Sequence, residues 1–167
     1  MYYFNENILN TRADTLIVPV DLSGKIRKGS LQEAVADILG KDYVDEYLDD
    51  IKRGLIIPGT VSSYHGMGEK STLPTIINFP AWAPAPNEVL MSHVMGQIQE
   101  VFTLSKPLLL YELAVPKVSE TYKWEALETM WLRAEQLFQG PEVWLYPPEE
   151  EEDESPTVEE AMTVVGV

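Results

Sequence analysis

Short apolar runs alternate along the chain with longer stretches in which apolar residues recur every three or four positions. The short runs predict buried strands at 15–20, 75–79, 106–115 and 142–146, and 60–64 also has β character. The longer stretches predict one helix capped by Ser30, one through 43–51, one from Asn87 and one that ends at Gly140. Three prolines between positions 80 and 86 make 81–86 a loop.

Strands that alternate with helices are typical of a layered α/β fold with a mostly parallel sheet. In such folds ligands lie beyond the carboxyl ends of the strands, so we expect a binding site among the loops 21–29, 81–86 and 117–123. The length of 167 residues predicts a single domain. We assign that domain to 1–148, and an acidic tail with an apolar tip to 149–167.

The composition narrows the chemistry. A net charge of -15, from 27 acidic and 12 basic residues, disfavours direct binding to nucleic acid or to an anionic membrane. The chain has no cysteine and only two histidines, which excludes thiol chemistry and a zinc ribbon, and we expect neither a metal nor a cofactor. The sequence has no basic leader and no run near the roughly 18 apolar residues of a membrane span, which predicts a cytoplasmic or intracellular protein.

Several short motifs occur in a characteristic order between residues 7 and 148. They are the segment Asn-Ile-Leu at 7–9, the strand LIVPVD at 16–21, the loop at 23–29, the strand IINFP at 76–80, the junction AVPKV at 114–118 and the closing VWLYPP at 143–148. In this order they resemble the macrodomain family, nearest to the antitoxin-type branch that removes ADP-ribose from DNA. The resemblance implies a three-layer α/β/α fold with a mixed sheet and an ADP-ribose site across the strand ends.

The resemblance also implies ligand-binding roles for individual residues. Asn7 corresponds to an Asn or Asp near the adenine, and Lys28 with Gly29 to the Lys-Gly pair that closes the first ligand loop before a helix. Asp21 replaces the second of two asparagines that the family carries on the first strand, and its carboxylate is still able to accept a hydrogen bond from a ribose hydroxyl. Ser119 lies in the loop that corresponds to the second phosphate loop, and Trp82 is a candidate for stacking on an adenine or on a partner side chain.

Other positions depart from the family pattern. Val18 replaces the first of two asparagines on the first strand, and Trp82 stands where the antitoxin branch carries a lysine. The loop 118–123 contains no glycine, although a backbone that approaches a pyrophosphate closely needs one, and Glu120 adds a repulsive carboxylate. We therefore predict a degenerate site and assign no catalytic residue.

Each candidate also has an interpretation without a ligand. Asp21 is compatible with capping a turn, Lys28 with a solvated loop position, and Trp82 with covering an apolar surface. We interpret His65 as a surface residue and His93 as a structural residue of a helix.

Three functions remain open. The first is a non-catalytic macrodomain-like binding or interaction protein that retains weak binding of ADP-ribose or another nucleotide. The second is an ADP-ribosyl glycohydrolase that acts on modified DNA or protein and uses Asp21 to orient water. The third is an acidic inhibitor or structural protein that covers a basic surface of its partner.

The tail suggests a protein partner. Eight acids lie between Glu149 and Glu160, and a small apolar peptide follows them at 161–167. An acidic tether with an apolar tip is suited to docking on a groove with a basic rim. We expect Val164, Val165 and Val167 to make that contact.

Overall fold

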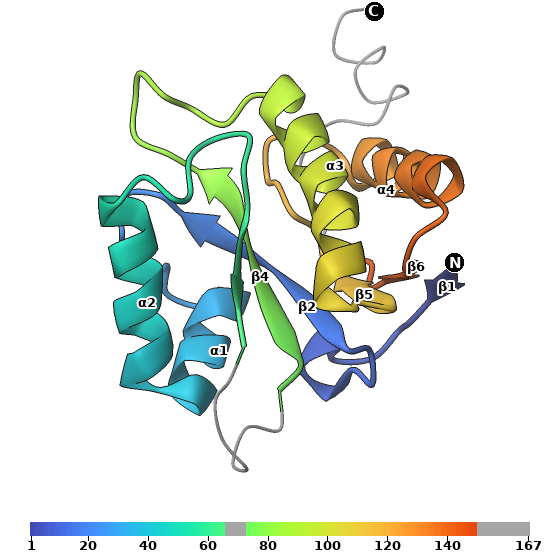
Figure 1. Ribbon diagram of the computed structural model, residues 1–167, viewed down its shortest axis with the longest axis horizontal. Helices are drawn as coiled ribbons and strands as arrows, with labels where there is room; N and C mark the ends of the chain where they lie inside the picture. The colour runs from blue at the N-terminus through green and yellow to red at the C-terminus, as the bar shows by residue number, and fades with distance from the viewer. Residues whose placement is uncertain (66–72, 150–167) are drawn as a thin grey trace, which may run out of the picture.

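The structure, a computed structural model, describes residues 1–65 and 73–149. In these residues a six-stranded sheet with the order β1-β6-β5-β2-β4-β3 lies between two layers of helices (Figure 1). The strands are β1 (Tyr2–Tyr3), β2 (Thr15–Asp21), β3 (Ser62–Tyr64), β4 (Thr75–Trp82), β5 (Glu112–Val115) and β6 (Glu142–Leu145). The helices are the 3-10 helix η1 (Ile8–Asn10), α1 (Leu31–Leu39), α2 (Lys41–Lys52), α3 (Met91–Leu108) and α4 (Trp124–Phe138).

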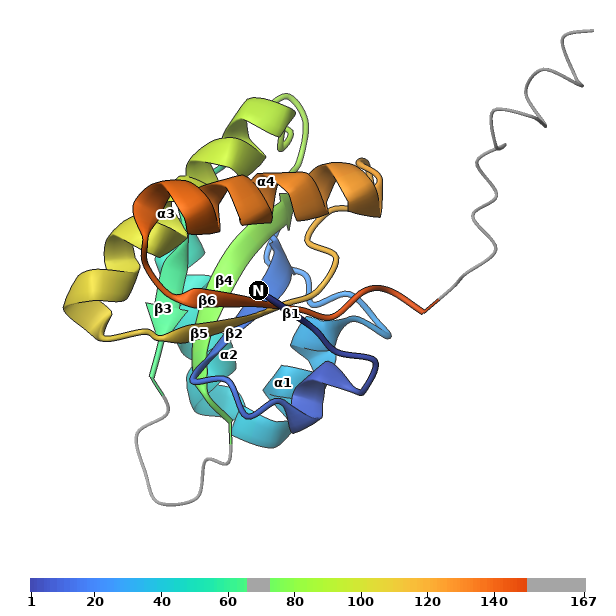
Figure 2. The same cartoon turned by 90° about the vertical axis from the view of Figure 1, so that its right-hand side faces the viewer.

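The sheet is mixed, because β3 runs antiparallel to β4 and the other described pairs are parallel. Helices α1 and α2 lie on one face and α3 and α4 on the other (Figures 1 and 2). This arrangement confirms the predicted three-layer α/β/α class.

Strand β2 is the centre of the fold, and all of its residues are buried. Ile17 packs into the core beneath α3 and α4, while Leu16 and Val18 pack into the core beneath α1 and α2. A strand covered on both faces has no solvent-facing positions, which explains why its sequence is a continuous apolar run rather than an alternating one.

The start of α1 fixes the loop that precedes it. Ser30 Oγ accepts a hydrogen bond from the Glu33 backbone N–H (3.2 Å), as predicted for a capping residue. Glu33 Oε1 in turn accepts from the backbone N–H of Gly29 (3.1 Å), one residue before the cap. Gly29 has a φ of +78°, which favours glycine at this position.

Strand β4 is longer than predicted, because it continues through Pro80 to Trp82. The carbonyl oxygen of Pro80 accepts a hydrogen bond from Gln97 Nε2 of α3 (2.8 Å), so this side of the backbone faces α3 and not β2. The N–H that proline lacks is therefore not needed for pairing with β2. The loop predicted at 81–86 consequently begins after Trp82.

The prediction for 106–115 was wrong in its first half. Helix α3 starts at Met91, not at Asn87, and continues to Leu108 with Pro107 in its last turn. Its end is closed by the Leu110 backbone N–H, which donates to the carbonyl of Ser105 (2.8 Å). Only Glu112–Val115 forms strand β5. The edge strand β1, which pairs Tyr2 with Trp144, was not predicted at all.

The described residues end at Glu149, so all but the first residue of the predicted tail lies outside them. The domain boundary at 148 stays a prediction. Within the described residues, every helix is too short or too polar to cross a lipid bilayer.

Candidate functional site

Three adjoining hollows lie over the carboxyl ends of the strands. The central hollow has a volume of about 170 Å³ and is lined by Pro19, Ser30, Leu31, Trp82, Pro116, Lys117, Val118, Ser119 and Glu120. The Asp21 hollow, of about 390 Å³, shares the Trp82 wall and adds Asp21, Ser23, Arg27 and Tyr122 among others. The Asn7 hollow, of about 430 Å³, shares Pro116 with the central one and includes Phe4, Asn7 and Tyr146. The central hollow thus shares one wall residue with each of the other two, and we call the three together the track.

Four of the six predicted ligand-binding residues line this track. Asn7 lines the Asn7 hollow, Ser119 the central hollow and Asp21 the Asp21 hollow. Trp82 lines both the central hollow and the Asp21 hollow. Lys28 and Gly29 are exposed in the turn before α1 and are not among the residues that line these three hollows. The partner-binding residues predicted in the tail, Val164, Val165 and Val167, lie outside the described residues.

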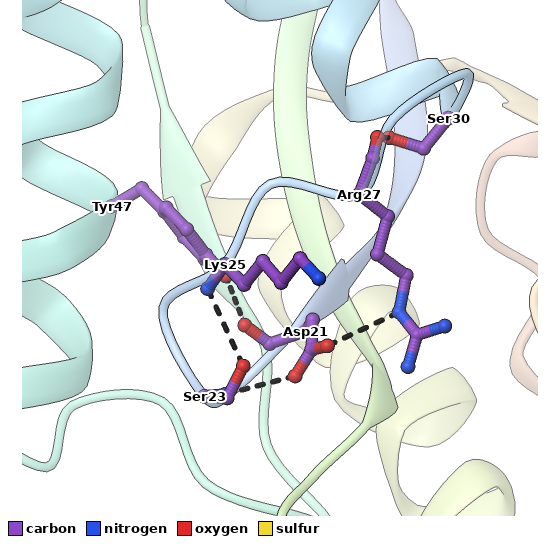
Figure 3. Close-up of polar contacts among 6 residues, drawn as sticks. All are labelled: Asp21, Ser23, Lys25, Arg27, Ser30 and Tyr47. Carbon is purple, nitrogen blue, oxygen red and sulfur yellow. Dashed lines mark hydrogen bonds and ion pairs between the residues drawn. The ribbon is translucent and has the colours of Figure 1, made fainter.

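Asp21, at the end of β2, is held by its own loop (Figure 3). Its Oδ1 accepts a hydrogen bond from the Ser23 backbone N–H (2.9 Å), and its Oδ2 lies 3.1 Å from Arg27 Nε. The Tyr47 hydroxyl of α2 donates to the Asp21 backbone carbonyl, and burial raises the pKa of Tyr47 to about 12. Asp21 is only 7% exposed, and each of its carboxylate oxygens has a partner within the loop.

Arg27 joins this carboxylate to the aromatic wall. Its guanidinium carbon lies 4.1 Å above the centre of a Trp82 ring, within the range of a cation–π contact. The backbone N–H of Leu22 also donates to the carbonyl of Trp82 (2.8 Å), so the loop and the end of β4 are tied together. Arg27 was not among the predicted site residues. The available signal was a base six positions after Asp21 in the same loop.

The loop between β5 and α4 is closed upon itself. Ser119 is 5% exposed, and its Oγ accepts a hydrogen bond from the Thr121 backbone N–H (3.2 Å). Val118 is fully buried in the core below. One backbone donor that would otherwise be available to a ligand is thus used within the loop.

The Asn7 hollow has an aromatic wall whose residues were not among the predicted site residues either. Phe4 stacks on Tyr146 with ring centres 5.0 Å apart and an angle of 11° between the rings. The Tyr146 hydroxyl donates to Thr11 Oγ1 (2.7 Å), which fixes its ring. Asn7 Oδ1 accepts a hydrogen bond from the Leu9 backbone N–H (3.0 Å) and caps η1, so its carboxamide oxygen is already used.

Two of the loops beside the track are rich in basic residues. The segments 22–30 and 116–123 contain five of the twelve basic residues and a single acid, Glu120; the bases are Lys25, Arg27, Lys28, Lys117 and Lys123. The lining of the three hollows is itself mixed in charge: its bases are Arg27 and Lys117, and its acids are Glu6, Asp21, Glu88, Glu120 and Glu149.

The two histidines lie elsewhere. His65 Nδ1 is 3.2 Å from Thr75 Oγ1 at the start of β4, the opposite end of that strand from Trp82. His93 Nδ1 accepts a hydrogen bond from the Leu90 backbone N–H (2.9 Å) at the start of α3. Among the described residues no group of three histidines or carboxylates is arranged to hold a metal ion.

Comparison with solved structures identifies the architecture: the chain has the macrodomain fold. It superposes on the macrodomain of Mycobacterium tuberculosis DarG with a TM-score of 0.77 and 19% identity, over 89% of this chain and 97% of that one. The macrodomain of Thermus aquaticus DarG gives a TM-score of 0.74 and 21% identity, over 88% and 97% of the respective chains.

A third similar structure is Thermosipho africanus DarTG in complex with ADP-ribose. The TM-score is 0.71 with 18% identity, and the match covers 87% of this chain and 40% of that chain. A scan against protein-family models and a comparison with curated proteins each found no match.

Proposed function

We propose that the protein binds an ADP-ribose-like nucleotide along the track of three hollows and does not release ADP-ribose from modified DNA or protein. The observation that carries this proposal is the order of groups along the hollows at the strand ends: the aromatic wall of Phe4 and Tyr146, then the start of α1 with Lys117, then Arg27 on Trp82. A nucleoside diphosphate linked to a second sugar has the extended shape and the negative charge that such a track would accept. One similar structure is of a complex with ADP-ribose, in agreement with this class of ligand.

The Asn7 hollow suits the adenosine end of the ligand. The Phe4 and Tyr146 rings offer an apolar wall, on which an adenine ring can pack. The adjoining central hollow suits the diphosphate, since Ser30 and Leu31 at the start of α1 and Lys117 line it. The first N–H groups of a helix have no partner within the helix, and the positive end of its dipole favours an anion.

The groups around the Asp21 hollow support the proposed lack of glycohydrolase activity. Asp21 accepts a hydrogen bond from Ser23 and forms an ion pair with Arg27, which stabilises the carboxylate and makes it a weaker base. Trp82 offers no nucleophile at the position where the family resemblance implies a lysine. Neither histidine lines the three hollows.

Isothermal titration calorimetry with ADP-ribose tests the binding. We expect a Kd in the tens of micromolar, or about 6 kcal/mol of binding free energy, because part of the phosphate-binding backbone is lost. Asp21→Asn, with its melting temperature measured in parallel, should weaken binding. Lys106→Gln should not, because Lys106 is exposed at the end of α3 that leads into the start of β5, away from the carboxyl ends of the strands. A wild-type protein with no binding at millimolar ADP-ribose would refute the proposal.

Release of ADP-ribose from a modified oligonucleotide or protein tests the second claim. We expect no turnover above background. Turnover that Asp21→Asn abolishes would instead establish the glycohydrolase alternative.

A further inference from the structure

The guanidinium of Arg27 is fixed on two of its sides. Its Nε lies 3.1 Å from Asp21 Oδ2, and its central carbon lies 4.1 Å from the centre of a Trp82 ring. Within the described part of the chain, its two terminal nitrogens have neither a hydrogen bond nor an ion pair. Figure 3 shows both nitrogens on the side of the guanidinium that points away from Asp21.

This group lies where the central and Asp21 hollows meet. Trp82, on which it stacks, lines both hollows, and the Arg27 side chain lines the Asp21 hollow. The Arg27 backbone carbonyl accepts hydrogen bonds from Ser30 Oγ (2.6 Å) and from the Ser30 N–H (3.2 Å), and Ser30 lines the central hollow. A dinucleotide-like ligand that follows the track would bring its second phosphate to this junction.

The junction needs a cation to accept an anion. Glu88 lines the Asp21 hollow and Glu120 the central one, and each carboxylate would repel a phosphate at close range. The loop 116–123 offers no glycine, and it uses the Thr121 N–H on Ser119. A planar guanidinium held edge-on can donate two parallel hydrogen bonds to a phosphate, which a lysine cannot do.

We infer that Arg27 is the diphosphate-binding residue of this cleft and that it makes the site selective for nucleoside diphosphates over nucleoside monophosphates. The inference rests on the proposed nucleotide function and specifies the ligand group that determines affinity. Because Arg27 Nε holds Asp21 while the terminal nitrogens face the ligand, the ion pair persists in the complex.

Calorimetry on the full chain with ADP-ribose, ADP, AMP and inorganic pyrophosphate tests the inference. The variants are Arg27→Gln, Arg27→Lys and the control Arg133→Gln, which removes the same group from an exposed position of α4 that lines none of the three hollows. We expect the wild type to bind ADP about tenfold more tightly than AMP, the scale of one charged hydrogen-bonding contact. Arg27→Gln should lose about tenfold in affinity for ADP-ribose, ADP and pyrophosphate and less than twofold for AMP. Arg133→Gln should lose less than twofold for all four.

Three outcomes decide the matter. If the wild type binds ADP-ribose and Arg27→Gln binds it within twofold of the wild type, the inference is wrong and the proposed function stands. If the wild type fails to bind ADP-ribose but binds pyrophosphate through Arg27, the proposed function is wrong and the diphosphate role stands. If Arg27→Gln does not fold, Arg27→Lys decides: a loss of fivefold or more for ADP supports the inference, and wild-type affinity overturns it.

Discussion

A cluster of carboxylates at the amino ends of the strands predicts that the stability of the fold depends on pH. Glu112 and Glu142 are register partners at the starts of β5 and β6, and Asp14 precedes β2 beside them. A hydrogen bond between the Glu112 and Asp14 carboxyl groups, then burial, then the charges of Asp14 and Glu142 raise the pKa of Glu112 to about 7. None of the three carboxylates takes part in an ion pair within the described residues.

The raised pKa sets the sign of the effect. The unfolded chain ionises Glu112 near its ordinary pKa of 4.5, and the folded chain ionises it only near 7. The folded state therefore loses stability as the pH rises from 4.5 to 7, and the loss is complete above 7. A gap of this size would correspond to a few kcal/mol for a buried group, but solvent reaches Glu112 and screens the charges, so we expect about 1 kcal/mol.

Glu112→Gln removes the ionisation and leaves an amide that can donate to Asp14. In urea titrations from pH 5 to pH 8.5, the variant should be about 1 kcal/mol more stable than the wild type at pH 8, and the difference should vanish near pH 5. Asp37→Asn, at an exposed position of α1, is the control, and its stability relative to the wild type should not change with pH in this way. A constant difference between Glu112→Gln and the wild type at every pH would refute the reasoning.

Two further substitutions test the scaffold. The buried Tyr43 hydroxyl donates a hydrogen bond to Asn78 Oδ1 (2.7 Å) and accepts one from Gln32 Nε2 (3.3 Å). Tyr43→Phe should therefore lower the free energy of unfolding in urea by about 1–3 kcal/mol. The control Tyr111→Phe, at an exposed ring, should leave it almost unchanged. Leu109 caps α3 with a φ of +56° and is 67% exposed. Because glycine has no Cβ to strain this backbone conformation, Leu109→Gly should raise the free energy of unfolding by about 0.5 kcal/mol. Leu109→Ala keeps the Cβ and should not raise it. A destabilised glycine variant would contradict the assigned strain.

The sequence predicted the elements whose signals are local. The Ser30 cap and the buried run of β2 each depend on a few adjacent residues. The end predicted for α4 at Gly140 is two residues late, because α4 ends at Phe138 and Gln139 adopts the left-handed cap. The predictions failed where tertiary contacts decide. Pro80 is accepted in β4 because Gln97 of α3 takes its carbonyl, and the apolar segment after Lys106 completes a helix because Leu110 closes its last turn on Ser105.

The candidate site divides in the same way. Loop position at the strand ends and the family resemblance led to Asp21, Trp82 and Ser119, all of which line the track. Arg27 lies in the predicted loop 21–29, but what distinguishes it from the other bases of that loop is its contact with Trp82, 55 positions away in the sequence. Spacing within one segment carries no information about such a pair.

The energy of the Asp21–Arg27 pair limits how any ligand can bind. Separating the pair would leave a nearly buried carboxylate short of a partner, at a cost of about 1–3 kcal/mol or more. A ligand that binds with only about 6 kcal/mol would lose most of its affinity if it had to replace Arg27 at Asp21 with a neutral ribose hydroxyl. A phosphate that approaches the terminal nitrogens leaves Nε on Asp21 and avoids this cost. The ligand that fits this cleft best is therefore one whose diphosphate, rather than its second sugar, meets the Asp21–Arg27 pair.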